Sequence, residues 1–272
     1  MKEVIDPAMT LKITGFLKLT NSYRPIYEIQ KFNGLSLCNL WLNKLELRKI
    51  KIDSTINKCS FHTHIRSKNR IGPHNIDIIS VIIGSLLGHG NGEKRNLNGV
   101  RIRYRQSIIN EEYIFWLYRF FNQRGYCSNL RPHYYNRISK IKGISKNYQG
   151  YEFNLYTFTS FEWIYKMFYK KGKKRIHPNI GNYLTPLALA IWISDDGCWT
   201  GYGVRIATNC FTLKEVKLLI YILKKIYNLN TTIQKIYIKD KYSIYIKKES
   251  ISDLRKIVSP FMHESMKYKL GL

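Results

Sequence analysis

Two apolar runs that each end at a glycine divide most of this sequence into two similar parts. Residues 82–90 read IIGSLLGHG and residues 189–197 read LAIWISDDG, so that His89 and Asp196 occupy corresponding places. A run that is apolar on nearly every side indicates a helix buried between the layers of a soluble protein. A unit that occurs twice at this size predicts two related halves, each with a buried helix near its start.

The same succession of elements follows each run. Residues 100–106 and 203–208 resemble strands, and an amphipathic helix comes after each of them. The first of these helices has Asn110 before an acidic first turn, and the second begins with a capping box of Thr212 and Glu215. Two more strands and a short final helix complete each copy. The final helices are expected to open at Thr159 with Glu162 and at Ser250 with Asp253.

We therefore predict an α/β protein, of the α+β kind, built from two pseudo-symmetric αββαββα halves with antiparallel sheets and paired central helices. The first half spans residues 76–178 and the second spans residues 179–272. Residues 1–75 have no counterpart in either half and show no sustained period. We expect them to form an irregular N-terminal extension.

The charge of the chain indicates what it binds. Its 45 Lys+Arg against 18 Asp+Glu give a formal net charge of +27, while 44% of the residues are hydrophobic. The apolar fraction is enough for a core and excludes a disordered chain. A cationic surface of this strength repels itself unless a polyanion neutralises it, which favours nucleic acid, with an anionic membrane surface as the second candidate. No apolar stretch reaches the roughly 20 residues of a spanning helix, so no transmembrane helix is predicted. We expect nucleic acid rather than a membrane as the partner.

The predicted strands carry basic and aromatic residues on one side. Arg101, Arg103 and Arg105 alternate with Ile102 and Tyr104, which puts three guanidinium groups on one face. A guanidinium can donate two hydrogen bonds to guanine or bind phosphates, and a two-stranded ribbon fits the major groove. A solvated sheet face would alternate equally well, but three arginines in register favour groove contact. The nucleic-acid-binding residues that we predict on the two sheets are Arg101, Arg103, Arg105, Arg205, Lys235, Tyr237, Lys239, Ser243, Tyr245 and Lys247.

The five cysteines are odd in number and widely spaced, which indicates a reducing compartment without a disulfide framework. Cys59 with His62 and His64 could form half of a zinc site, but no second ligand pair lies at a suitable spacing. An exposed polar loop is therefore the favoured interpretation of these three residues.

Small residues recur at every fourth place in both apolar runs, as Gly84 with Gly88 and as Ala190 with Ser194. Such stripes let two helix backbones approach closely, so we predict that the two helices pair and that their C-terminal ends lie side by side. Acidic groups at these ends could hold divalent cations between the protein and a phosphate, as in nucleases that use two metal ions.

With these paired motifs the sequence resembles, over residues 70–272, the LAGLIDADG family of intron-encoded homing endonucleases and maturases in its two-motif monomeric form. Residues 70–75 (RIGPHN) and 265–270 (SMKYKL) are similar to mitochondrial members encoded in cytochrome-gene introns. The resemblance implies a saddle-shaped sheet over the DNA major groove, Mg²⁺-dependent cleavage and a mitochondrial location.

The resemblance also implies roles for individual residues. Asp196 corresponds to the metal-binding acid of the second motif, and the backbone of Gly88 to a metal ligand of the first. The preceding Asp195 falls at a variable position of the family and ranks lower. Polar residues that order water at the metal site correspond to Gln106 and to Thr208 or Asn209. Basic residues that support the developing charge correspond to Lys173 or Lys174 and to Lys267 or Lys269.

One departure from the family pattern affects the predicted chemistry. Where the first motif should end in Asp-Gly, this chain has His89-Gly90. A neutral imidazole is a poor ligand for Mg²⁺, which prefers oxygen, so cleavage of at least one strand should be weakened. Glu93 could replace the missing acid, but it lies past the end of the helix. A packed or solvated His89 at a degenerate metal position is favoured over a ligand.

Two functions remain open at this point. The first is a monomeric homing endonuclease that binds a long double-stranded DNA site and cuts it with Mg²⁺. The alternative is an RNA maturase that uses the same scaffold, with weakened or lost cleavage, to help its own intron RNA fold for splicing. A nickase that relies on Asp196 alone lies between them. A plain transcriptional DNA-binding protein is the least favoured class, because it would need nothing special at Asp196.

Overall fold

The computed structural model describes residues 65–66, 69–95, 99–141, 144–236 and 241–272, all within one compact unit. The proposed zinc ligands Cys59, His62 and His64 fall outside these residues, as does most of the predicted N-terminal extension. Tyr237 and Lys239, two of the predicted nucleic-acid contacts, also lie outside them.

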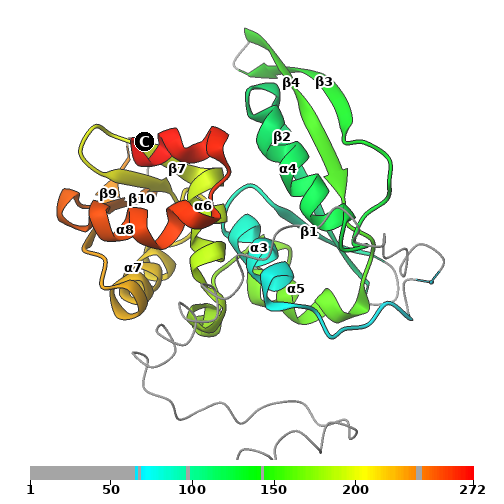
Figure 1. The fold of residues 1–272 in the computed structure, drawn as a ribbon, viewed down its shortest axis with the longest axis horizontal. Coiled ribbons are helices and arrows are strands. Elements are labelled where there is room, and N and C mark those ends of the chain that lie inside the picture. Colours follow the sequence, from blue (N-terminus) through cyan, green and yellow to red (C-terminus); the bar gives the residue numbers. More distant parts are fainter. Residues whose placement is uncertain (1–64, 67–68, 96–98, 142–143, 237–240) are drawn as a thin grey trace, which may run out of the picture. The chain divides into compact units, whose positions relative to one another are not determined.

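The first half has the predicted αββαββα order. It consists of α3 (Ile76–Leu87), β1 (Asn91–Lys94), β2 (Val100–Ser107), α4 (Glu111–Asn122), β3 (His133–Ile141), β4 (Ile144–Asn154) and α5 (Glu162–Phe168). Its four strands form an antiparallel sheet in the order β1-β2-β4-β3, and α4 packs against β2 and β4 (Figure 1). Two short strands, β5 (Tyr169–Lys170) and β6 (Lys173–Lys174), pair after α5.

The second half repeats this plan. It consists of α6 (Pro186–Asp196), β7 (Gly197–Trp199), β8 (Val204–Ala207), α7 (Leu213–Tyr227), β9 (Thr231–Lys235), β10 (Tyr242–Ile246) and α8 (Ile251–Val258), followed by the 3₁₀ segment η9 (Glu264–Leu270). The sheet order β7-β8-β10-β9 is the same as in the first half, and α7 packs on β9 and β10. The predicted fold class of mixed helices and antiparallel sheets is therefore confirmed.

The two motif helices, α3 and α6, pack against each other in the buried centre (Figure 1). A Cβ atom on Gly84 would meet the carbonyl oxygen of Ala188 and would lie 2.8 Å from the Cβ of Ile191. A Cβ on Gly88 would lie 2.8 Å from the Oδ2 of Asp195. Only residues without side chains allow this approach of the two backbones.

The partners of the two glycines differ from the predicted ones. Ala190 and Ser194 were expected to supply the small residues of α6, but the α6 atoms nearest to Gly84 and Gly88 belong to Ala188, Ile191 and Asp195. The physical reason is the pseudo-symmetry of the pair, because Ile191 and Asp195 are the residues that correspond to Gly84 and Gly88 in the repeat. At these corresponding positions α3 therefore has glycines, whereas α6 has larger side chains.

The capping box predicted for α7 is present. The Thr212 side chain accepts from the backbone of Glu215, and the Glu215 side chain accepts from the backbone of Thr212, so two free donors at the helix start are satisfied. Asn110 stands at the N-cap position of α4, but its side chain makes no capping hydrogen bond. The helix begins at Glu111 as expected, with two acidic residues in its first turn, where they stabilise the positive end of the helix dipole.

The capping boxes predicted for the two final helices are wrong. Thr159 lies in a 3₁₀ turn before α5, and its hydroxyl donates to the carbonyl of Arg70 at 3.3 Å. Ser250 occupies the N-cap position of α8, but its hydroxyl accepts from the backbone N–H of Asn230 at 2.8 Å. Both hydroxyls bond to a distant segment of the chain, which the local sequence pattern cannot reveal.

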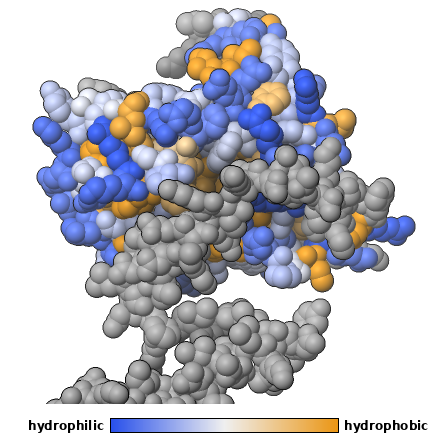
Figure 2. Space-filling view, viewed as in Figure 1, coloured by the Kyte–Doolittle hydropathy of each residue, from blue (hydrophilic) through white to orange (hydrophobic). Residues whose placement is uncertain are grey.

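Figure 2 shows that this side of the described residues is mainly hydrophilic, with a few separate hydrophobic patches. One patch lies over the β3–β4 hairpin, on which Ile138 is exposed. Among the described residues, none of the helices combines the length and the apolar character needed to cross a bilayer.

Candidate active site

The C-terminal ends of α3 and α6 bring the two corresponding motif residues together. The Nε2 atom of His89 lies 3.3 Å from the Oδ1 atom of Asp196. The His89 side chain is 55% exposed and the Asp196 side chain only 15%, so the carboxylate lies deeper than the imidazole. Burial raises the pKa of Asp196, and the nearby positive groups His89, Lys174 and Lys269 oppose this shift. The arrangement holds one carboxylate, where a symmetric pair of motifs would hold two.

Asp195 turns away from this pair and into the first half. Its Oδ2 accepts the backbone N–H of His89 at 3.2 Å, and its Oδ1 accepts the side-chain amide of Gln106 at 2.9 Å. Burial raises the pKa of Asp195 to about 6, against the lowering effect of His89. Asp195 therefore joins the two halves, since a residue of α6 fixes both the end of the first motif and a side chain of β2.

Two lysines donate to backbone carbonyls at the motif ends. The Nζ of Lys174 donates to Gly88 O at 2.9 Å, and the Nζ of Lys269 donates to Ser194 O at 2.5 Å and to Asp195 O at 3.0 Å. Burial lowers the pKa of both amines, opposed in part by nearby acidic groups such as Asp196. Gly88 and Asp195 correspond in the repeat, so each half supplies one lysine to the equivalent carbonyl.

The structure distinguishes between the lysine alternatives left open by the sequence. Lys173 is exposed, and Lys267 pairs with Glu264 on its own segment at 2.6 Å. Within the described part of the chain, neither forms a hydrogen bond or ion pair with the motif ends, whereas Lys174 and Lys269 both donate to carbonyls there. The sequence could not separate adjacent lysines, because the reach of a long side chain depends on where the last turn of each half lies.

The three predicted water-ordering residues have different surroundings. Gln106 is buried, and its side-chain amide donates a hydrogen bond to the Asp195 carboxylate. Thr208, at the corresponding place in the second half, is buried and donates its hydroxyl to Tyr242 O at 2.7 Å. Asn209 is exposed. In both halves the buried polar group is thus already engaged within the protein.

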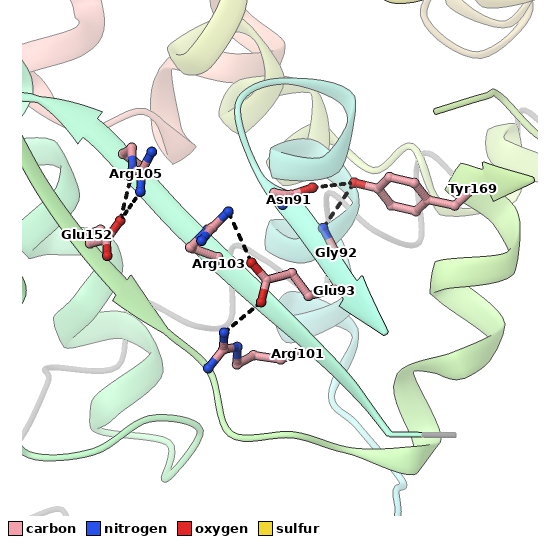
Figure 3. A network of polar contacts seen from close by, with 8 residues as sticks. All are labelled: Asn91, Gly92, Glu93, Arg101, Arg103, Arg105, Glu152 and Tyr169. Atoms are coloured by element: carbon pink, nitrogen blue, oxygen red, sulfur yellow. Dashed lines mark hydrogen bonds and ion pairs between the residues drawn. The ribbon is translucent and has the colours of Figure 1, made fainter. Parts of the chain in front are cut away.

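The basic face of the first sheet agrees with the alternation seen in the sequence. Along β2 the residues Ile102 and Tyr104 are buried, while Arg101, Arg103 and Arg105 point to the other face (Figure 3). Acidic partners, which the sequence analysis missed, stand on the same face. Glu93 pairs with both Arg101 and Arg103, and Glu152 pairs with Arg105. Glu93, on β1, is therefore paired with two arginines of β2 and does not replace the missing motif acid.

In the second sheet the predicted face is only partly as expected. Arg205 on β8 and Lys235 at the end of β9 are exposed, Tyr245 is half-buried, and Lys247 is exposed just beyond β10. Ser243 was predicted on the exposed face but is 2% exposed, and its hydroxyl donates to Gln234 O. It lies on the inner strand β10 between β8 and β9, where a side chain this short does not reach past its neighbours.

The donor set at the motif ends suits a hard cation. Asp196 offers a carboxylate, and Gly88 and Asp195 offer carbonyl oxygens, each with a second lone pair beside the one that a lysine uses. Oxygen donors of this kind are those that Mg²⁺ prefers. Within the described ranges, His, Cys, Asp and Glu side chains form no group of three or more that could hold a metal ion. The site therefore fits a cation that also takes oxygens from phosphate and water.

The fold and the site together define a two-motif protein whose paired helices place Asp195 and Asp196, both from the second motif, where the two helices end. The chain belongs to the LAGLIDADG DNA endonuclease family, whose family model matches residues 79–254.

Individual relatives carry two kinds of name. The chain is 54% identical over 157 residues to the intron-encoded endonuclease ai4 of Dictyostelium discoideum, a match that covers 57% of this chain and 99% of that protein. It is 45% identical over 211 residues to the cytochrome b mRNA maturase bI2 of Saccharomyces cerevisiae, covering 75% of this chain and 49% of that protein. The chain thus spans nearly all of the first relative but only about half of the second.

A solved structure supports the same assignment. The homing endonuclease I-WcaI bound to its DNA recognition sequence matches with a TM-score of 0.64 and 26% sequence identity, over 84% of this chain and 97% of that one. The match therefore extends over most of this chain, and that relative was solved with its recognition DNA bound.

Proposed function

We propose that this protein is a mitochondrial, intron-encoded homing endonuclease that binds a long double-stranded DNA site as a monomer and cleaves it with Mg²⁺. The observation that carries the proposal is the buried Asp196 carboxylate at the joined helix ends, with Lys174 and Lys269 on the adjacent carbonyls. The basic faces of the two sheets and the DNA-bound relative support DNA as the partner.

The residues at the helix ends have separable tasks. Asp196, with the carbonyls of Gly88 and Asp195, would hold a Mg²⁺ ion. When bound, such an ion polarises a phosphoryl oxygen and lowers the pKa of a bound water. The ammonium groups of Lys174 and Lys269 place positive charge where negative charge builds up on the phosphate, in a region where burial strengthens that attraction.

The difference between His89 and Asp196 should produce unequal cleavage of the two DNA strands. His89 contributes no oxygen ligand, and as an imidazolium it would pair with the one carboxylate present. The strand served by Asp196 should therefore be cut readily, and the other strand slowly. We expect a product that is mainly nicked DNA.

A second candidate function is that of an RNA maturase. It is favoured by the histidine at the first motif and by the yeast relative, whose name is cytochrome b mRNA maturase. RNA helices are recognised through shape and phosphates, so the same basic faces could serve an RNA ligand.

One preparation of the protein can decide between these functions. Supercoiled DNA that carries the junction of the flanking exons is incubated with Mg²⁺, and with EDTA as the control for metal removal. Nicked circles that need Mg²⁺ support the proposal, and rapid conversion to linear DNA would show that His89 does not impair the site. If no strand is cut, splicing of the intron RNA with and without the protein tests the maturase function. If Asp196→Asn leaves Mg²⁺-dependent nicking unchanged, the proposed metal site is refuted. If the protein neither cuts DNA nor promotes splicing, a plain DNA-binding protein remains.

A further inference from the structure

The exposed face of β2 is less cationic than its three arginines suggest, because every one of them is paired with a carboxylate (Figure 3). The Glu93 Oε2 accepts from Arg101 Nη2 at 2.6 Å, and the Glu93 Oε1 lies 3.1 Å from Arg103 Nη2. The Glu152 Oε2 accepts from Arg105 Nε at 2.8 Å and from its Nη2 as well.

Contacts of two tyrosines, Tyr169 and Tyr135, hold the residues of these ion pairs in place. The phenol oxygen of Tyr169 accepts the backbone N–H of Gly92 at 3.0 Å and donates to the Asn91 side chain at 3.1 Å, which fixes the strand that carries Glu93 (Figure 3). The guanidinium of Arg105 lies over the ring of Tyr135, 4.9 Å from its centroid. Burial raises the pKa of Glu93. The hydrogen bond from Arg101 and the charges of the neighbouring arginines outweigh this effect, so that the pKa is lowered overall.

Such pairing changes what an arginine can bind. A carboxylate cancels most of the attraction of a guanidinium for a distant phosphate, and its own charge repels phosphates. The planar guanidinium has five donors, so a paired arginine keeps free N–H groups, now held in one orientation. A base edge that offers two acceptors, as guanine does in the major groove, still suits such a group.

The second sheet lacks this arrangement. Arg205 on β8, Lys235 on β9 and Lys247 after β10 form no ion pair with any residue that the structure describes. Their full charges remain available to phosphates, which attract without regard to sequence. The two sheets thus differ in the kind of contact that their basic residues can make.

We propose that Glu93 and Glu152 are specificity-determining residues, which suppress phosphate binding by Arg101, Arg103 and Arg105 and orient these arginines toward base edges. This rests on the proposed function, because it takes the exposed face of β2 to be a DNA-binding face. Alternate residues of a strand lie about 6.7 Å apart and stacked base pairs about 3.4 Å apart, so neighbouring arginines would meet guanines about two base pairs apart.

The test compares binding to two duplexes at several salt concentrations. One duplex is the sequence that the wild-type protein enriches from a random pool, and the other is an unrelated sequence of the same length. The variants are Glu93→Gln and Glu152→Gln, which keep the size of the side chain and remove its charge. The matched control is Asp253→Asn, which changes the net charge by the same amount but removes the partner of Lys256 on α8, outside the sheets.

Each arginine released from its carboxylate should add one phosphate contact on unrelated DNA. The slope of log affinity against log salt should then steepen by about 0.9 per arginine, hence by about 1.8 for Glu93→Gln and about 0.9 for Glu152→Gln. The ratio of affinities for selected and unrelated DNA should fall roughly 10-fold at moderate salt, because only the unrelated complex gains. Asp253→Asn should change neither quantity.

The outcomes separate this inference from the proposed function. If the wild-type protein enriches no sequence, the proposed DNA function fails. If it enriches a sequence but the two glutamine variants keep the wild-type slope and ratio, only the role of the glutamates is refuted. An equal gain for Asp253→Asn would attribute the effect to net charge and would also refute it. Thermal unfolding of each variant verifies that it is folded.

Discussion

The ends of the two motif helices show how one scaffold can carry unequal chemistry. In each half a lysine from the last part of that half donates to the corresponding carbonyl, of Gly88 or of Asp195. The side chains at these places do not correspond. The first half presents Gly88 and His89, while the second presents two carboxylates, one buried in the first half and one beside the imidazole. The backbone contacts at the two helix ends correspond, whereas the motif carboxylates come from one half only.

Removing each motif side chain in turn tests whether the two helix ends contribute unequally. Asp196→Asn should reduce the nicking rate roughly 10³-fold or more, about 4 kcal/mol in activation free energy, because it removes the carboxylate proposed to hold Mg²⁺. His89→Asn should change the rate less than about 10-fold, since histidine supplies no oxygen ligand. Nicking of supercoiled DNA measures both, with gel-shift affinity as the control for binding. Equal losses in the two variants would contradict the asymmetry.

The buried Asp195 should make stability depend on pH. Its pKa rises from 3.8 to about 6 on folding, so between these values the folded protein holds a proton that the unfolded chain has released. The free energy of unfolding should therefore fall by about 3 kcal/mol as the pH rises through this window. Asp195→Asn should remove most of that slope, as measured by urea unfolding at pH 4, 5, 6 and 7. Asp253→Asn, which lies on an exposed surface, should keep it.

The helix pair can be tested at its closest point. Gly84→Ala should lower the free energy of unfolding by about 2 kcal/mol, because the new methyl group meets the Ala188 backbone and the Ile191 side chain. Gly181→Ala is the matched control, since its Cβ would find ordinary contacts 3.5 Å away on Ile222. Chemical unfolding gives both values. If Gly84→Ala costs no more than Gly181→Ala, the close approach of the two helices at Gly84 is not what limits stability there.

Restoring the missing acid should give the smallest change. His89→Asp should speed cutting of the slower strand about 10-fold, near 1.4 kcal/mol, because it adds an oxygen ligand next to Asp196. The ratio of linear to nicked DNA over time measures this gain. The control His89→Asn introduces a side chain of the same size as aspartate but without its charge, and it should show no gain in cutting of the slower strand. An unchanged ratio in His89→Asp would mean that Asp196 or another part of the site is also compromised.

The sequence predicted those features that depend on neighbours along the chain. The alternation of Arg101 to Arg105 and the capping box of Thr212 with Glu215 are local, and the structure contains both. The repeat also gave the order of elements in both halves. The succession of helices and strands could therefore be predicted without knowledge of any tertiary contact.

Features that depend on distant segments were not predictable. Asp195 ranks low as a functional residue on the sequence alone, which does not reveal that its hydrogen-bond partner Gln106 comes from the other half of the chain. The pairing of Arg105 with Glu152 depends on the register between β2 and β4, which no local pattern specifies. The hydroxyls of Thr159 and Ser250 failed as caps for the same reason, since each bonds to a segment far away in sequence.

The close approach of α3 and α6 at Gly84 has a consequence for recombining such proteins. The basic residues Arg101, Arg103, Arg105 and Arg205 lie on strands rather than on these two helices, so they can change without altering the contact between α3 and α6. A chimaera that joins this first half to a foreign second half needs an incoming helix whose backbone can lie as close to Gly84 as Ala188 and Ile191 do here. Compatibility between partners in such an exchange is therefore set by the spacing of two helix backbones rather than by the residues on the sheets.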